Sequence, residues 1–174
     1  FNQMSACKNA YRERGATVVM LPLNLFLENR AAWKLTPVAV LTNRETSGQF
    51  HIISKRAACE NCLTGQTVAT GLKASDRFLS KVAFDGRIAV GRDFQLKRTR
   101  SPIRAIKSLV KDKVIAAIVN DTQMRSLNGL PGTSDIKTIL SGPKLPGAIV
   151  ASVGKASKGL EKALLSFCKT EKAL

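Results

Sequence analysis

Short apolar runs alternate with amphipathic segments along most of the 174-residue chain. Apolar runs of about four to eight residues are typical of buried strands, whereas apolar positions three or four residues apart indicate helices. The runs predict strands over residues 16–23, 37–43, 49–55, 66–71, 87–91, 94–98, 114–120, 136–140 and 148–154. Helices are expected over residues 24–35, 75–84, 101–113 and 157–168, with a short one after residue 121. This alternation predicts an α/β fold with mostly parallel sheets flanked by helices.

Helix starts are marked by residues that suit capping positions. Ser75 and Ser101 precede two of the predicted helices, and Pro102 follows Ser101 at the first helical position. Ser and Asn side chains accept hydrogen bonds from the free amides of a first turn, and proline there has no amide to leave unpaired. Asn24 is expected to cap the helix over residues 24–35 in the same way.

Three segments each combine a strand, a polar end and a helix start. They read "VVMLPLNLF", "GQTVATGLKASDRF" and "VIAAIVNDTQ". In open α/β sheets, ligands bind beyond the carboxyl ends of the strands, where helix N-termini present free N–H groups. Three such ends lying together would form an anion site without any catalytic residue.

The composition adds a strong positive charge to this pattern. Lysine and arginine number 28 against 12 acidic residues, a formal net charge of +16, and they are densest over residues 92–113. Such a charge attracts nucleic acid, acidic lipid and small oxyanions alike, so it does not choose among them. A solvated basic face without a specific partner is an equally good explanation.

Four cysteines are present, and two of them form a CxxC motif. The candidates for disulfide bonds are Cys59 and Cys62 in that motif, together with Cys7 and Cys168. One CxxC with a single histidine, His51, is a poor zinc site, so no metal is expected. A structural disulfide between Cys59 and Cys62 is favoured over a redox-active pair, because no thioredoxin-like context surrounds the motif.

Motifs for catalysis and for membrane insertion are missing from the sequence. The nucleophile-elbow pattern, the P-loop, the dinucleotide fingerprint and a recognisable carboxylate pair are all absent. The sequence therefore predicts no catalytic residue, no enzyme activity and no cofactor. No apolar run approaches the roughly 18 residues needed to span a bilayer.

The order of several short phrases resembles the phosphate/phosphonate-type periplasmic substrate-binding proteins of ABC transporters, which have the type II binding-protein fold. The phrases are "YRERGATVVMLPLNLF", "LTPVAVLT", "GQFHIISK", "NCLTGQTVATG", "SLVKDKVIAAIVND" and "SGPKLPGAIVAS". The resemblance implies a two-lobed α/β protein that captures a small anionic or zwitterionic solute in an interlobe cleft and delivers it to an ABC permease. It also implies a periplasmic or otherwise extracytoplasmic location. The family's first strand and helix would precede Phe1.

The resemblance also implies lobes and ligand contacts. Lobe one would comprise residues 1–50 and 121–174, and lobe two residues 51–120. Ser75 is the first ligand candidate, with the backbone amides of Ala74 and Asp76 beside it. Asn24, Asn120 and Ser47 are weaker candidates; capping is the alternative role of Asn24, and Ser47 lies near the expected hinge. Asp121 would hold the amine of a zwitterion such as an aminoalkylphosphonate, or would cap the next helix.

Three other functions stay open. The basic stretch "KRTRSPIRAIKSLVKDK" suits nucleic-acid binding, although aromatic residues make up only 5% of the chain and no stacking platform is evident. An assembly or scaffold role on a modified binding-protein fold is the second. Thiol–disulfide chemistry at Cys59 and Cys62 is the third.

Overall fold

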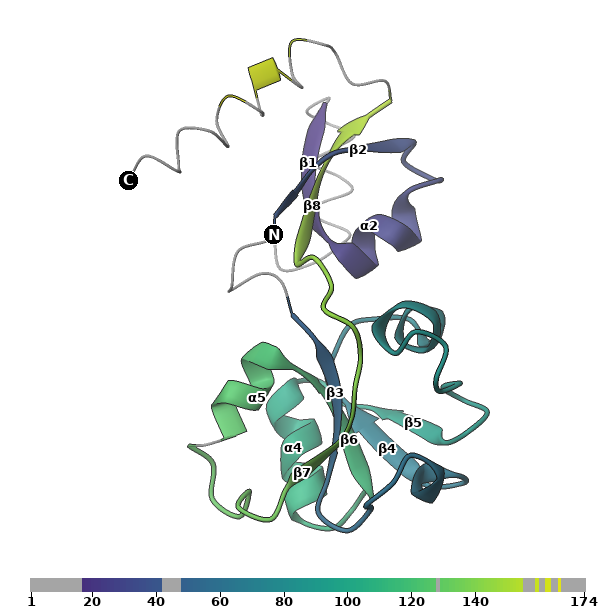
Figure 1. The fold of residues 1–174 in the computed structure, drawn as a ribbon, viewed down its shortest axis with the longest axis vertical. Helices are drawn as coiled ribbons and strands as arrows, with labels where there is room; N and C mark the ends of the chain where they lie inside the picture. Colours follow the sequence, from purple (N-terminus) through teal and green to yellow (C-terminus); the bar gives the residue numbers. More distant parts are fainter. Residues whose placement is uncertain are drawn as a thin grey trace. The chain divides into compact units, whose positions relative to one another are not determined.

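The computed structural model describes residues 17–41, 48–127 and 129–154, together with positions 159, 162, 163 and 166. The chain divides into two compact units (Figure 1). Unit 1 comprises Phe1–Thr46 and Pro146–Leu174, and unit 2 comprises Ser47–Leu145. Each unit is described by itself below.

Unit 1 contains a three-stranded antiparallel sheet with a short helix. Its strands are β1 (Val18–Pro22), β2 (Leu35–Leu41) and β8 (Ala148–Val153), in the order β1-β8-β2, and its helix is α2 (Leu23–Asn29). The central strand β8 returns from unit 2 and pairs with both neighbours. The core of the unit consists of Leu21, Phe26, Leu35, Ile149 and Ala151. Phe26 is the buried residue of α2, and Leu23 and Leu25 of the same helix pack against the core around it.

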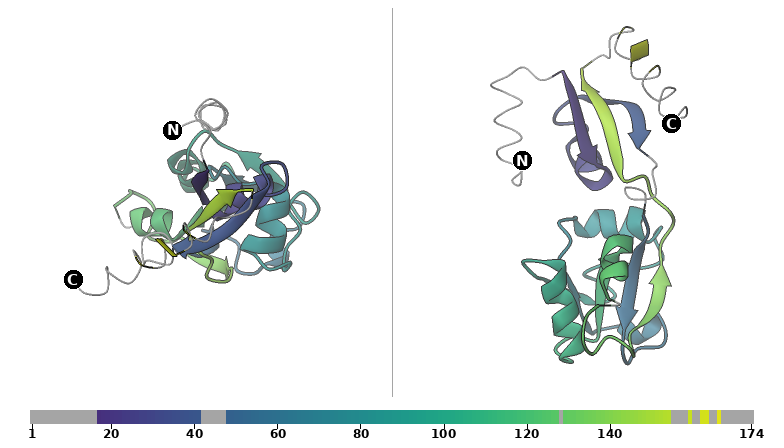
Figure 2. Two further views of the ribbon diagram at one scale, coloured as in Figure 1. Left: turned by 90° about the horizontal axis from the view of Figure 1, so that it is seen from above. Right: turned by 90° about the vertical axis from the view of Figure 1, so that its left-hand side faces the viewer.

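Unit 2 contains a five-stranded mixed sheet in the order β5-β4-β6-β3-β7. The strands are β3 (Phe50–Ser54), β4 (Thr67–Thr70), β5 (Gln95–Arg98), β6 (Ala116–Asn120) and β7 (Lys137–Ser141). Strand β4 is parallel to β5 and β6, whereas β3 is antiparallel to β6 and β7. Strand β7 lies at the edge of the sheet beside β3 (Figure 2).

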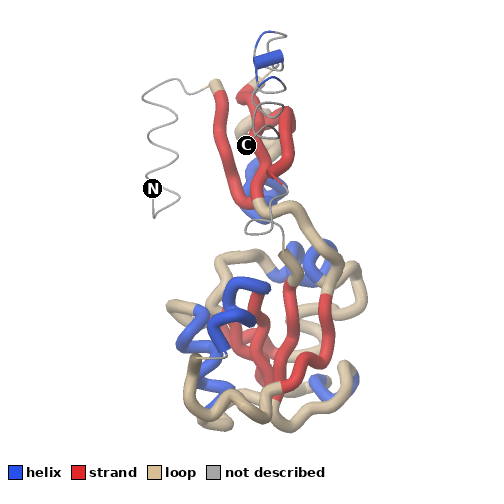
Figure 3. The backbone as a smooth tube through the Cα atoms, turned by 60° about the vertical axis from the view of Figure 1, so that its left-hand side comes forward, coloured by secondary structure: helices blue, strands red, loops and turns tan. Residues whose placement is uncertain are grey.

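Helical segments lie on both sides of this sheet (Figure 3). They are η1 (Asn61–Leu63), α3 (Asp76–Phe78), the π-helical η2 (Leu79–Ala83), α4 (Pro102–Val110) and α5 (Asp121–Leu127). Ile52 and Ile53 are adjacent on β3 and both fully buried, which shows that each face of the sheet is covered. On one face Ile53 packs in a cluster with Ile106 and Leu109 of α4 and Leu127 of α5.

The helix caps at Ser75 and Ser101 are confirmed. The Ser75 hydroxyl oxygen accepts a hydrogen bond from the Phe78 amide, and that of Ser101 accepts one from the Arg104 amide. Pro102 follows in the first turn of α4, as expected. The cap predicted at Asn24 is wrong, because Pro22 occupies the N-cap of α2 and Asn24 is the second helical residue.

Most predicted strands are confirmed, but the segment over residues 87–91 is not a strand. It forms turns around Asp93, whose carboxylate accepts a hydrogen bond from the Ala89 amide at 2.7 Å. The helix predicted over residues 24–35 ends at Asn29, and Lys34 adopts a positive φ of 49° just before β2 begins. Local hydrogen bonds thus replace the strand expected over residues 87–91 and the last part of the helix expected over residues 24–35.

The α/β class is confirmed, but the expectation of mostly parallel strands is wrong. The sheet of unit 1 is antiparallel throughout, and in unit 2 only the pairs β4–β5 and β4–β6 are parallel. Buried apolar runs reveal that both faces of a strand are covered, yet they do not carry its direction, which depends on the connections.

The division between the units differs from the lobe boundaries expected from the resemblance. The second lobe was expected to end at residue 120, whereas unit 2 continues to Leu145. The extra residues contain α5, which packs on β6, and β7, which pairs with β3. These contacts keep them with the five-stranded sheet.

Candidate functional site

Four strands of unit 2 end on the same side of its sheet, and we call this row of strand ends the carboxyl edge. Strands β4, β5, β6 and β7 end there at Thr70, Arg98, Asn120 and Ser141, and the antiparallel β3 begins there at Phe50. Ligands of open α/β sheets bind beyond such strand ends. The carboxyl edge is therefore the place to look for a solute site within unit 2.

Two glycines allow backbone segments to approach closely at this edge. A Cβ added to Gly71, directly after β4, would lie 2.1 Å from the carbonyl carbon of Ser101. A Cβ added to Gly142, directly after β7, would lie 1.7 Å from the Ala83 carbonyl oxygen. Real Cβ atoms do not come this close to backbone atoms, so the packing excludes side chains at both positions.

Asp121 presents a fixed carboxylate at the carboxyl edge. One carboxylate oxygen accepts a hydrogen bond from the Gln49 amide at 2.8 Å, and the other lies 2.7 Å from His51 Nε2. The Asp121 side chain is 35% exposed to solvent, so a ligand could still reach it. Burial raises the pKa of Asp121, but the hydrogen bonds from His51 and Gln49 outweigh it and hold the pKa below its usual value. Asp121 is therefore an accessible anion at neutral pH.

His51 fixes the position of the Asp121 carboxylate through their hydrogen bond. The imidazole is buried, with 8% exposure, and its Nδ1 lies 2.8 Å from the Ser141 hydroxyl oxygen. Strand register explains the contact, because His51 of β3 pairs directly with Ser141 of β7. On the other side of β3, Phe50 pairs with Asn120, and the Asp121 amide donates a hydrogen bond to the Gln49 carbonyl, so Asp121 lies opposite Gln49, two residues before His51 in sequence. The sheet thus builds a chain of hydrogen bonds from Ser141 through His51 to Asp121.

This chain contains the residue types of a Ser–His–Asp triad. Acyl transfer also needs amide donors aimed at the developing oxyanion beside the nucleophile. The amide of Gly142, next to Ser141, instead donates to the Phe50 carbonyl at 2.9 Å within the sheet edge. The arrangement therefore supports a positioning role of His51 for Asp121 rather than covalent catalysis.

The sequence had suggested Asp121 as a candidate, but not the contacts that His51, Gln49 and Ser141 form around it. The alternation over residues 49–55 did place His51 on a strand, but the strand's partners could not be inferred from that pattern. Asn120, the neighbouring candidate, caps α5 instead. Its side chain accepts from the Gln123 amide while the Gln123 side chain accepts from the Asn120 amide. Asn120 therefore fills the capping role that had been considered for Asp121.

Ser75 and its neighbours lie in the segment that leads from Gly71 into α3. Ala74 is buried, Ser75 is half-buried and Asp76 is exposed. The Asp76 carboxylate accepts a hydrogen bond from Arg98 at 2.5 Å, which partly neutralises a charge that would otherwise repel an anion. The structure thus gives Ser75 a definite capping role, and its ligand role stays a prediction.

Replacing Ser75 by alanine is expected to lower the free energy of unfolding by about 1 kcal/mol, because the Phe78 amide loses its acceptor. Thermal melting of the variant checks this value. The exposed Ser126→Ala variant is the matched control and should stay within about 0.5 kcal/mol of the parent.

A second variant separates capping from ligand binding. Ser75→Asp keeps a good N-cap but adds a negative charge. If Ser75 contacts an anionic group of the ligand, Ser75→Asp should melt like the parent and lose ligand-induced stabilisation. Unchanged ligand stabilisation would contradict the contact.

The remaining candidates lie elsewhere. Asn24 is half-buried in the first turn of α2 in unit 1. Ser47 falls outside the described residues, as do Cys7 and Cys168. Cys59 and Cys62 form a disulfide, which confirms the expected pairing. Among the described residues, no group of three or more potential metal ligands comes together.

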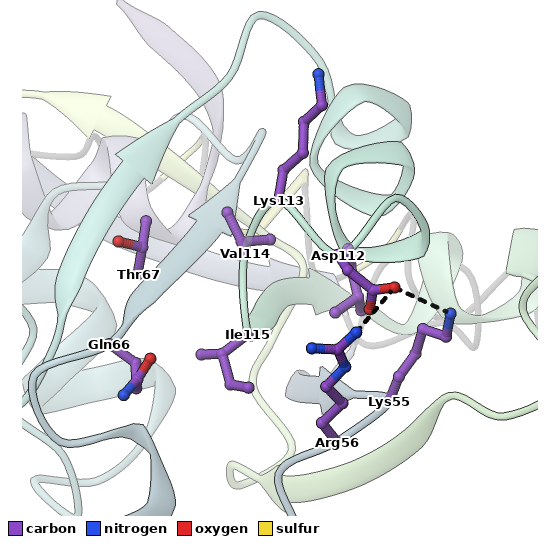
Figure 4. A pocket seen from close by; sticks show the side chains of 9 residues that line it. Lys55, Arg56, Gln66, Thr67, Asp112, Lys113, Val114 and Ile115 are labelled. Atoms are coloured by element: carbon purple, nitrogen blue, oxygen red, sulfur yellow. Dashed lines mark ion pairs between the residues drawn. The ribbon is translucent and has the colours of Figure 1, made fainter.

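A separate pocket of about 260 Å³ opens at the opposite edge of the sheet, where β4 and β6 begin (Figure 4). Asp112 in this pocket lies 3.2 Å from Arg56 and 4.0 Å from Lys55. Lys55 and Arg56 are therefore already paired within the protein, which leaves Lys113 as the one cation of the described lining without an ion pair among the described residues.

No family model and no curated protein matches the chain. Solved structures do resemble it. They include the substrate-binding protein of an amino acid ABC transporter, at 16% identity and a TM-score of 0.59, and an ancestral arginine-binding protein bound to arginine, at 15% and 0.57. A third is XAC2383 from Xanthomonas citri bound to ATP, at 12% and 0.65.

These similarities extend over nearly the whole chain but not over the whole of the other proteins. The alignments cover 95%, 96% and 91% of this chain and 69%, 71% and 65% of those chains, in the same order. Among the described helices, none has the length and apolar character needed to cross a bilayer. The chain has the α/β fold of the two-lobed periplasmic binding proteins.

Proposed function

We propose that the protein is an extracytoplasmic solute-binding protein that captures a small zwitterionic ligand for an ABC permease. The ligand's amine would bind the Asp121 carboxylate. The observation that carries the proposal is the geometry of Asp121, whose two oxygens are fixed by Gln49 and His51 while part of the carboxylate stays exposed. A binding role needs only such preorganised groups and no catalytic residue.

The charge of Asp121 favours an amine-bearing ligand over phosphate itself. A carboxylate whose pKa lies below its usual value repels an oxyanion but attracts an ammonium or guanidinium group. Similar structures include a binding protein of an amino acid ABC transporter and one bound to arginine, which supports this ligand class. Aminoalkylphosphonates carry the same amine and add the oxyanion that Ser75 would bind. Both kinds of zwitterion are therefore candidates.

Thermal melting with a small panel of solutes tests the proposal. The panel comprises glycine, L-glutamate, L-arginine, 2-aminoethylphosphonate, methylphosphonate and inorganic phosphate. At least one amine-bearing member should raise the melting temperature in a saturable way, with about 2.7 kcal/mol of stabilisation at one hundred times its Kd. Phosphate and methylphosphonate, which lack the amine, are the matched controls. If no amine-bearing member stabilises the protein, the proposal is wrong.

A further inference from the structure

A second feature of unit 2, distinct from Asp121, is a groove of about 560 Å³ lined by cations. We call it the basic groove. Its charged lining residues are Arg98, Arg100, Arg104, Lys107, Lys111 and Lys113. Thr99 and Ser108 complete the described lining, which contains no acidic side chain and no aromatic ring.

The cations of the groove are held by two parts of the fold. Arg98 and Arg100 come from the end of β5 and the connection that follows it, while Arg104, Lys107 and Lys111 follow one face of α4 and its C-cap. The opposite face of α4 is buried through Ala105, Ile106 and Leu109. Because that buried face fixes the rotation of the helix, the basic face must point away from the sheet.

Most of this charge has no counterpart among the residues that the structure describes. Arg98 pairs with Asp76, but within the described part of the chain none of the other five cations forms an ion pair. Asp112 lies between Lys111 and Lys113 in sequence, yet its carboxylate contacts Lys55 and Arg56. Five neighbouring cations without partners repel one another, and an external polyanion would relieve that repulsion.

We propose that the basic groove binds the phosphodiester backbone of a nucleic-acid strand, independently of the solute site. Arg104 and Lys111 are seven residues apart, or about 10 Å along a helix. One strand of nucleic acid carries about three phosphates over that length. The absence of an aromatic ring in the groove means that bases are not stacked, so binding is electrostatic and indifferent to sequence.

The apolar content of the surface argues against a membrane as the partner. Binding to a lipid surface draws on apolar side chains that enter the interface. In the described part of unit 2, Ile103 is the one large hydrophobic residue that is strongly exposed, at 52%.

Binding of a labelled 20-nucleotide oligothymidylate to the full chain tests the proposal. If the five cations without ion pairs contact phosphates, log K should fall with log salt with a slope of about −3.5, which is a loss of roughly 130-fold between 50 and 200 mM salt. The variant Arg104→Glu/Lys107→Glu/Lys111→Glu removes three contacts. It should weaken binding at least about 30-fold at 50 mM salt and reduce the slope to about −1.4.

The matched control is Lys81→Glu/Lys137→Glu/Lys144→Glu, which changes the net charge equally at three exposed positions outside the groove. It should bind within about threefold of the parent. An equal loss in both triple variants would show that the attraction belongs to the whole charge and would overturn the groove as a site. Should the groove variant fail to fold, the single variants Lys107→Gln and Lys111→Gln replace it, each expected to change the slope by about 0.7.

Competition by lipid vesicles and solute binding by the groove variant are two further tests of the proposal. Vesicles of phosphatidylglycerol and phosphatidylcholine should not compete with the oligothymidylate, and binding to vesicles alone would overturn the proposal in favour of a membrane partner. Solute-induced stabilisation should persist in the groove variant, since Asp121 is unchanged. If no solute stabilises the protein, the oligothymidylate test of the groove is therefore still valid. If the oligothymidylate does not bind, the solute test is likewise still valid.

Discussion

Gly71→Ala is expected to destabilise unit 2 by at least about 3 kcal/mol, which is a larger effect than most single substitutions produce. The added methyl group would lie 2.1 Å from the Ser101 carbonyl carbon and 2.2 Å from the Pro102 nitrogen. These are backbone atoms at the start of α4, so they cannot rotate away as a flexible side chain would. Relief requires α4 to shift against β4, which would disturb the buried cluster beneath it.

Thermal unfolding measures this effect, and a fall of at least roughly 12 °C is expected for a unit of this size. Gly129→Ala is the matched control, because a Cβ there meets no atom within 4 Å. The control should melt within a few degrees of the parent. A Gly71→Ala protein that melts like the control would contradict the close approach of β4 and α4.

Asp121→Asn is expected to weaken binding of an amine-bearing solute by at least about 30-fold, because the variant removes the charge that attracts the amine. The asparagine oxygen can still accept the Gln49 hydrogen bond, so the fold should be retained. Calorimetric titration of the solute that stabilises the parent most strongly measures the change. Asp135→Asn, at an exposed carboxylate elsewhere in unit 2, is the control and should bind normally.

The pH dependence of binding offers an independent check on Asp121. Its folded-state pKa is lowered from an ordinary value of 3.8, so the carboxylate stays charged throughout the neutral and mildly acidic range. The stabilisation that its ionised form contributes is fully present above 3.8 and is lost only as the pH falls through the lower folded value. Amine binding should therefore be insensitive to carboxylate protonation between about pH 5 and 7. A loss of affinity that titrates in this window and is absent from Asp121→Asn would contradict the assignment.

The proposed nucleic-acid site and the proposed solute site involve different residues of unit 2, so the two functions are compatible. Asp121 offers a negative group at the carboxyl edge, whereas the basic groove extends along α4 with five cations that form no ion pair among the described residues. The net charge of +16 had left these functions as alternatives. Their separation in the structure turns them into two hypotheses with separate variants.

The elements that could be predicted from the sequence are those determined by short-range interactions. Ser75 and Ser101 act on amides three residues ahead, and Cys59 pairs with a cysteine three residues away. Apolar runs likewise report local burial, which is why most strands and the α/β class were correct. Asn24 was the exception among the predicted helix caps, because the N-cap of α2 is Pro22, two residues earlier.

Tertiary structure alone decided the direction of the strands and the composition of the candidate site. His51 meets Asp121 across 70 residues of sequence and Ser141 across 90, through the pairing of β3 with β6 and β7. Strand pairing at that separation depends on the global fold and leaves no local signature in the residues involved. For the same reason Asp112, which lies between two lysines in sequence, forms ion pairs with Lys55 and Arg56, which are more than 50 residues away. The sequence by itself determined where polar groups stand along the chain, and the folding of the sheet decided which of them meet.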